Sequence, residues 1–100
     1  MSTIEQRIYD GDRAREVLDN EQFKLAFDAI TAEIIEQWKQ APARDAAGRE
    51  SLWTMLKLAE RLKLALSSTL DTGKLAKAEL ERQRTLKERA AQWITPTSRY

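Results

Sequence analysis

The sequence contains no cysteine and no histidine, and these two absences exclude most of the chemistry open to a small protein. Without thiols the chain forms no disulfide framework and offers no reactive thiolate. Without imidazole or thiolate it also lacks the ordinary ligands of zinc and the base of Ser-His and Cys-His nucleophilic pairs. Carboxylates are the remaining candidates for acid–base or metal chemistry.

The carboxylates do not form a recognisable site in the sequence. The closest pairs are Glu33 with Glu36 and Glu79 with Glu81, and only Glu79 falls within an apolar helix face. A di-metal carboxylate bundle uses Glu-x-x-His motifs, which a chain without histidine cannot supply. The run 71–74, DTGK, has one glycine and lacks the spacing of a phosphate-binding loop. We therefore predict a protein that is not an enzyme and that binds no cofactor or metal.

Glycine and proline are also scarce, with three and two residues in 100. With 42% hydrophobic and 33% charged residues, this composition predicts an all-α protein. A chain of this length forms one small domain that buries about 60–65% of its unfolded surface. No apolar run reaches the roughly 20 residues of a membrane span, and the first residues lack the pattern of a signal peptide. We expect a protein that is intracellular or is assembled inside the cell.

The segment 49–70 is the longest strongly apolar stretch, and it contains no glycine or proline. At roughly 100° per residue, its main apolar arc consists of Leu52, Met55, Leu58, Ala59, Leu62, Ala65, Leu66 and Leu70. A narrower arc holds Trp53, Leu56 and Leu64. A helix that is apolar over so much of its circumference needs neighbours on two sides.

Residues 20–41 have the pattern of an amphipathic helix, capped by Asp19 or Asn20 and ended by Pro42. Its apolar stripe consists of Phe23, Phe27, Ile30, Ile34 and Trp38. The short connection 42–48, in which Asp45 caps the next helix, predicts that the flanking helices are antiparallel neighbours. Equal rise on both helices then places residues whose numbers sum to about 91 opposite each other.

The two ends of the chain are harder to interpret. Thr3 and Gln6 form a potential capping box for a short helix that Gly11 would end, although residues 1–18 could equally be an arm ordered only by a partner. Near residues 70–75 we expect a turn, with Gly73 after the end of the helix, in preference to a continuous helix. A third helix over 74–94 and a non-helical tail, 95–100, would follow.

Charge is distributed unevenly along the chain. Residues 1–42 hold five Lys/Arg against nine Asp/Glu, a net charge of −4, whereas residues 74–100 hold seven against three, a net charge of +4. One face of the predicted third helix is a candidate nucleic-acid contact that includes Lys74, Lys77, Arg82, Arg84 and Arg89, with Arg99 extending it. The interspersed glutamates favour the alternative of a solvated or intersubunit salt-bridge face.

Six apolar residues are the candidate protein-interaction residues because they fall outside the main stripes or near their edges. They are Trp53, Leu56, Leu64, Leu25, Ile35 and Trp93. Three tryptophans in a small chain could also form a ligand-binding box, but tryptophans at these spacings are more typical of core and interface anchors.

The segment from Phe23 to Glu81, above all Arg49–Trp53 (RESLW) and Asp71–Ala76 (DTGKLA), resembles small helical proteins of tailed bacteriophages and prophages. Their genes lie near the head and packaging genes, and they generally have no assigned activity. The resemblance implies a role in virion assembly or interaction, in the cytoplasm of the host cell, with or without incorporation in the virion. It identifies no site residue.

The sequence therefore predicts one all-α domain over residues 1–100. It comprises a short N-terminal helix or arm (1–18), an antiparallel helical hairpin (19–73) and a third long helix (74–94). The predicted function is non-enzymatic: a phage-type assembly or structural protein that binds other virion proteins and copies of itself, without a membrane. The alternatives are a nucleic-acid-binding packaging or regulatory factor and a small inhibitor of a host enzyme or defence complex.

Overall fold

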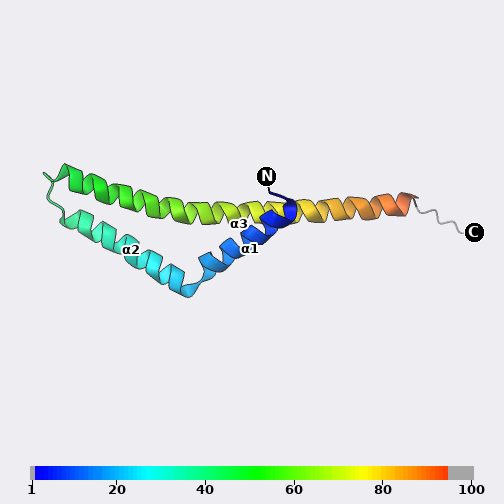
Figure 1. The fold of residues 1–100 in the computed structure, drawn as a ribbon, viewed down its shortest axis with the longest axis horizontal. Helices are drawn as coiled ribbons and strands as arrows, with labels where there is room; N and C mark the ends of the chain where they lie inside the picture. The colour runs from blue at the N-terminus through cyan, green and yellow to red at the C-terminus, as the bar shows by residue number, and fades with distance from the viewer. Residues whose placement is uncertain (1, 95–100) are drawn as a thin grey trace, which may run out of the picture.

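A computed structural model describes residues 2–94, and over that range the chain forms three α-helices and no strand. They are α1 (Ile4–Asp19), α2 (Glu21–Gln40) and α3 (Ala46–Ile94), which lie as shown in Figure 1. The predicted all-α class is confirmed. The predicted tail 95–100, which includes Arg99, lies outside the described residues.

Side-chain caps start the first two helices at positions that the sequence indicated. The Thr3 Oγ1 atom accepts a hydrogen bond of 3.0 Å from the Gln6 amide. The Gln6 side chain donates instead to Asp10, so only half of the predicted capping box forms. Asn20 has an extended backbone between α1 and α2, and its Oδ1 atom accepts from the Phe23 amide at 2.9 Å. A single residue thus ends one helix and caps the next.

Local contacts also define the turn between α2 and α3. Ala41 is extended, with ψ at 135°, as expected for a residue that precedes proline. The Asp45 carboxylate accepts from the Gly48 amide at 3.0 Å and caps α3, as predicted. The Arg49 guanidinium lies over the Trp38 ring, 4.2 Å from its centroid, and donates to the Ala41 carbonyl oxygen. These contacts hold the start of α3 against the end of α2.

The predicted turn at residues 70–75 is wrong, because α3 runs without a break for 49 residues. At 1.5 Å per residue the helix is about 73 Å long. The predicted third helix, 74–94, is its second half. The α1 helix lies beside the beginning of this half, and the remainder extends beyond the other two helices (Figure 1). Gly73 has no positive φ, so it does not end a helix.

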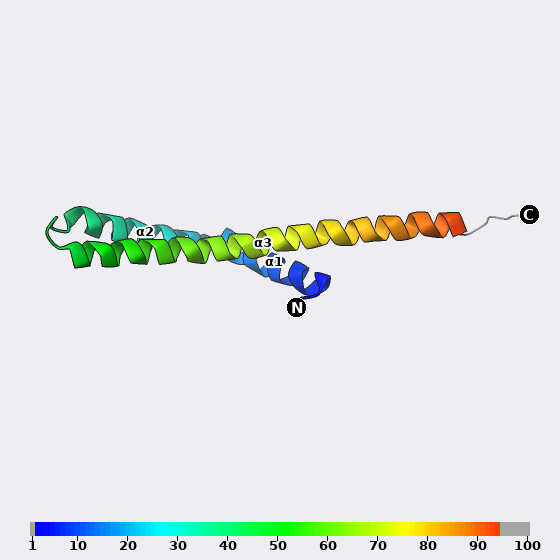
Figure 2. The same cartoon turned by 90° about the horizontal axis from the view of Figure 1, so that it is seen from above.

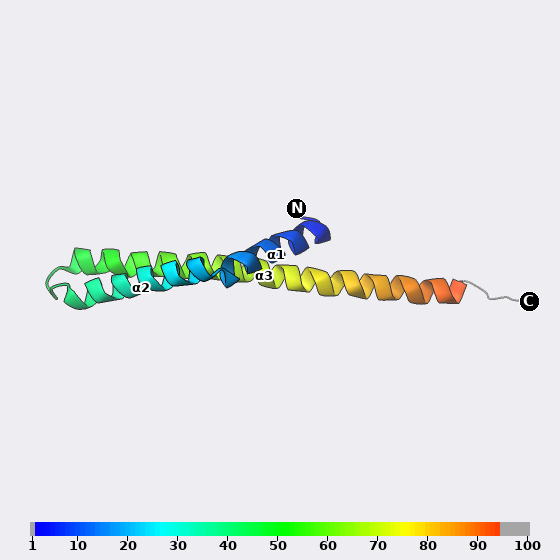
Figure 3. The same ribbon diagram turned by 90° about the horizontal axis from the view of Figure 1, so that it is seen from below.

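Gly73 instead marks the place where α1 crosses α3. A Cβ atom built on Gly73 would lie 2.8 Å from the Cα atom of Gly11, closer than two carbon atoms normally approach. Ala14 and Ala76, one turn further along each helix, are 4% and 3% exposed. Figures 2 and 3 show α1 passing obliquely across α3 at this point. The prediction that Gly11 ends a helix is also wrong: it lets the two backbones meet.

The α2 helix lies beside α3 near their connecting turn and diverges from it toward the junction with α1, which returns to α3 (Figure 1). Trp38 and Trp53 line one groove between the two helices, and Ile35 and Leu56 both line a second. Both pairs are compatible with the predicted register. However, α2 contains no buried residue. The predicted stripe of α2 therefore lines an open seam rather than a closed core.

The described chain consequently has almost no hydrophobic core of its own. Ala14 and Ala76 are its only buried hydrophobic residues among those the structure describes. The accessible surface is 7971 Å², whereas a compact monomer of 11.5 kDa exposes about 5,800 Å². The radius of gyration is 23.3 Å, against about 13 Å for a compact domain of 100 residues. About 2,000 Å² more surface is exposed than a chain of this mass needs to expose.

Candidate protein-interaction surface

An apolar groove runs along one side of the seam between α2 and α3. At the end near the turn it has a volume of about 260 Å³, and it is lined by Ile34, Ile35, Trp38, Leu52, Trp53 and Leu56. A second, wider cleft of about 510 Å³ shares Ile35 and Leu56 with it and continues toward Phe27 and Leu64. We call this pair of hollows the seam groove. It is open to solvent along its length.

Four of the six predicted interaction residues line the seam groove. Ile35, Trp53, Leu56 and Leu64 come from two helices and lie on the same side of the hairpin. They meet because residues 35 and 56 face each other across the seam, while positions 53 and 64 flank the groove on α3. The sequence indicated each of these residues separately but not that they form one surface.

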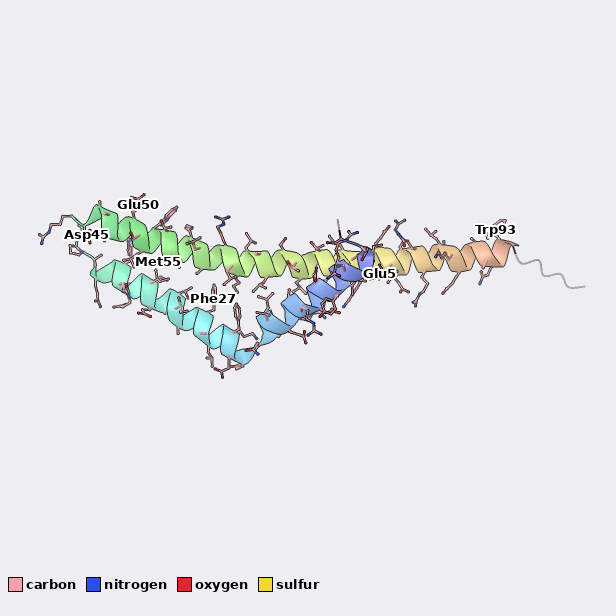
Figure 4. The ribbon with its side chains drawn as sticks, in the orientation of Figure 1. Glu5, Phe27, Asp45, Glu50, Met55 and Trp93 are labelled. Atoms are coloured by element: carbon pink, nitrogen blue, oxygen red, sulfur yellow. The ribbon has the colours of Figure 1, made fainter. Side chains whose placement is uncertain are left out.

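The other two predicted interaction residues lie elsewhere. Leu25 is exposed on α2 and does not line either hollow. Trp93 is 88% exposed near the far end of α3, a long way from Phe27 and Met55 (Figure 4). Neither residue belongs to the seam groove.

The main apolar arc of the central segment is exposed where the sequence predicted a covering helix. Met55, Leu58 and Leu62 are all more than half exposed, and so is Ile30 on α2. The reason is topological. Because residues 74–94 continue α3 in a straight line, they cannot fold back to cover its first half. These residues form a second exposed apolar stripe, for which the sequence pattern had predicted a place in the core.

Polar groups border the seam groove without closing it. Glu60 and Lys63 line the wider cleft, and the Lys63 ammonium lies 5.1 Å from the centroid of the Phe27 ring. Lys57 pairs with Glu60 at 3.3 Å and lies 5.6 Å from the centroid of the Trp53 ring. An apolar floor with a charged border is the usual composition of a protein-binding surface.

Three of the predicted nucleic-acid contact residues already have acidic partners. Lys77 forms an ion pair of 2.8 Å with Asp12, which joins α3 to α1. Arg82 pairs with Glu79 at 2.7 Å, and Arg84 pairs with Glu81 at 2.6 Å. No ion pair of Lys74 or Arg89 occurs within residues 2–94.

These contacts shift the ionisation of the groups involved. The hydrogen bond from Lys77 lowers the pKa of Asp12, and the hydrogen bond from Arg82 lowers the pKa of Glu79. The hydrogen bond to Glu81 raises the pKa of Arg84. Each shift favours the charged form, so the cations are held in local pairs.

The basic residues are spread over a broad arc of α3. At roughly 100° per residue, Lys77 and Arg84 lie at one edge of this arc and Arg82 and Arg89 at the other, with Lys74 between them. Glu81 and Glu88 fall within the same arc and dilute its positive charge. Arg99 lies outside the described residues.

Comparison with known protein families, curated proteins and solved structures finds no match to this chain. Within the described part of the chain, no three acidic side chains are placed so that they could hold a metal ion. None of the described helices combines the length and the apolarity that crossing a bilayer requires.

Proposed function

We propose that this protein is a non-enzymatic assembly protein that acts by binding other protein chains, copies of itself among them. The observation that carries the proposal is the surface of 7971 Å², about 2,000 Å² in excess of a compact monomer of this mass. A standard interface buries about 800 Å² per partner, and obligate interfaces bury more. The excess is therefore of the size that permanent assembly covers.

The distribution of apolar residues supports the same proposal. Monomeric proteins rarely expose contiguous apolar patches larger than a few hundred Å². Here the seam groove exposes Trp53 and Leu64, and the second stripe exposes Met55, Leu58 and Leu62. A two-helix hairpin has no third element to enclose such residues. Association with another chain supplies it.

The charge distribution supports a directional contact. The acidic residues of 1–42 lie in α1 and α2, while α3 carries an excess of Lys and Arg. Opposite net charges on different helices orient two chains as they meet and disfavour wrong arrangements.

We place this activity in virion assembly, because residues 23–81 resemble small helical proteins encoded near phage head and packaging genes. The protein would act in the cytoplasm of the host cell and could be retained in the particle. Deletion of the gene from the phage or prophage that carries it should lower the titre of infectious particles without changing host growth. An unchanged titre would contradict this assignment.

Sedimentation equilibrium tests the self-association. We expect a mass that rises with concentration above the 11.5 kDa of one chain, and a fluorescence spectrum of the tryptophans that shifts to shorter wavelength over the same range. A single 11.5 kDa species at millimolar concentration would contradict self-association.

A further inference from the structure

Four residues form a line along the exposed side of α3 that borders the seam groove. Trp53, Lys57, Glu60 and Leu64 are spaced by four, three and four residues, so they lie on one side of the helix over about three turns. Trp53 and Leu64 are 58% and 67% exposed, and the two charged residues between them are also exposed. No other described element covers this line.

The line is complementary to itself when it is reversed. Its order along the chain is apolar, basic, acidic, apolar. If a second copy lies antiparallel, with a two-fold axis between residues 58 and 59, Trp53 faces Leu64 of the second copy. Lys57 then faces Glu60 of the second copy, and symmetry repeats both contacts. Every apolar residue meets an apolar residue, and every charge meets its opposite.

We propose that a second copy of this chain binds here, forming a two-fold dimer through antiparallel α3 helices. The inference rests on the proposed self-association and specifies its surface and symmetry. The indole of Trp53 would enter the wider cleft of the second copy, whose volume is about 510 Å³ and which Leu64 and Glu60 line. Since that cleft lies between α2 and α3, both helices of each hairpin would take part, in the manner of a four-helix bundle.

The geometry of the monomer leaves room for this arrangement. With equal rise on both helices and the axis between residues 58 and 59, the paired part of α3 extends from residue 46 to residue 71. The α1 helix meets α3 at Thr69 and Gly73, which lie on the side of α3 opposite Trp53, so the pairing does not disturb the crossing. The distal halves of the two α3 helices would project in opposite directions from a central bundle.

Charge reversal on the full chain tests the pairing. Lys57→Glu places a second carboxylate against Glu60 of the other copy, and Glu60→Lys places two ammonium groups together. Each variant alone should therefore raise the dissociation constant about tenfold or more. An equimolar mixture of the two variants should restore the dimer, because each contact then joins opposite charges. The chain with both substitutions should also dimerise.

A second ion pair on α3 provides the matched control. Glu81 and Arg84 are exposed and three residues apart, as Lys57 and Glu60 are, but they lie outside the proposed contact. Glu81→Lys and Arg84→Glu should leave the dissociation constant unchanged. Circular dichroism of every variant checks that the helix content is kept.

Tryptophan substitutions test the apolar part of the contact. Trp53→Ala should raise the dissociation constant about 30-fold, as expected for a central anchor, and Trp93→Ala should leave it unchanged. If the wild-type chain dimerises but the charge reversals and Trp53→Ala have no effect, this surface is wrong and self-association stands. A wild-type chain that stays monomeric overturns both.

Discussion

A methyl group added at Gly73 should force α1 and α3 apart. The new Cβ atom would lie 2.8 Å from the Gly11 Cα atom and 3.0 Å from the Arg7 carbonyl oxygen. Both neighbours are backbone atoms, which cannot rotate out of the way. Because carbon atoms in contact are about 3.5–4.0 Å apart, α1 must move by roughly 1 Å.

Two opposing effects determine the change in the free energy of unfolding. Alanine is favoured over glycine within a helix by about 1 kcal/mol. Overpacking of a close contact typically costs about 1–3 kcal/mol. We therefore expect Gly73→Ala to be neutral or destabilising by up to about 2 kcal/mol, although it improves the helix propensity of α3. Ala78→Gly, at an exposed position of the same helix, measures the propensity effect alone.

Urea unfolding at one fixed protein concentration gives the free energies, and hydrogen exchange of residues 4–19 reports whether α1 remains docked. In Gly73→Ala the amides of α1 should exchange faster, whereas Ala78→Gly should not affect α1 selectively. If Gly73→Ala raises the free energy of unfolding by about 1 kcal/mol and leaves the exchange of α1 unchanged, the crossing of α1 and α3 does not depend on the close approach of the two glycines.

Three further results are expected. The pKa of Asp12 is lowered by Lys77 from its ordinary value of 3.8, so the contact stabilises the fold above that pH and is lost as the pH falls through the lowered pKa. The difference in free energy of unfolding between wild type and Lys77→Met, measured by urea unfolding, should therefore vanish in strong acid. A difference that does not change with pH would refute a contribution of this ion pair to stability. Asn20→Ala should cost about 1 kcal/mol by removing the cap of α2, with no loss in the neighbouring exposed Gln22→Ala. Mobility-shift titrations should find no binding of duplex DNA at physiological salt. Salt-dependent binding that disappears when Lys74 and Arg89 are neutralised would instead support the nucleic-acid alternative.

Part of the candidate surface could be predicted from the pattern of residues in the sequence. Trp53, Leu56 and Leu64 form a narrow arc within one helix, and Ile35 lies outside the stripe of another, so periodicity alone marks them as available for a second contact. The register across a short turn brings them together. Leu25 and Trp93 are apolar residues of the same kind, and nothing in the neighbouring sequence distinguishes them from these four. They nevertheless do not line the seam groove.

The helical content and the start of each helix follow from local sequence alone. Thr3, Asn20 and Asp45 cap helices through bonds to amides three residues ahead, and Ala41 is extended because proline follows it. These effects act within one turn of the chain, so they can be predicted without knowledge of the rest of the fold.

The roles of Gly11 and Gly73, and the exposure of Leu58 and Leu62, depend instead on how the helices are arranged in space. A glycine satisfies two different needs, a left-handed backbone at a helix end and a close approach of two helices, and its neighbours in sequence do not distinguish them. Periodicity likewise shows which residues share a face but not whether another element covers it. Since α3 continues through Gly73, its second half does not fold back, and Leu58 and Leu62 on its first half stay exposed.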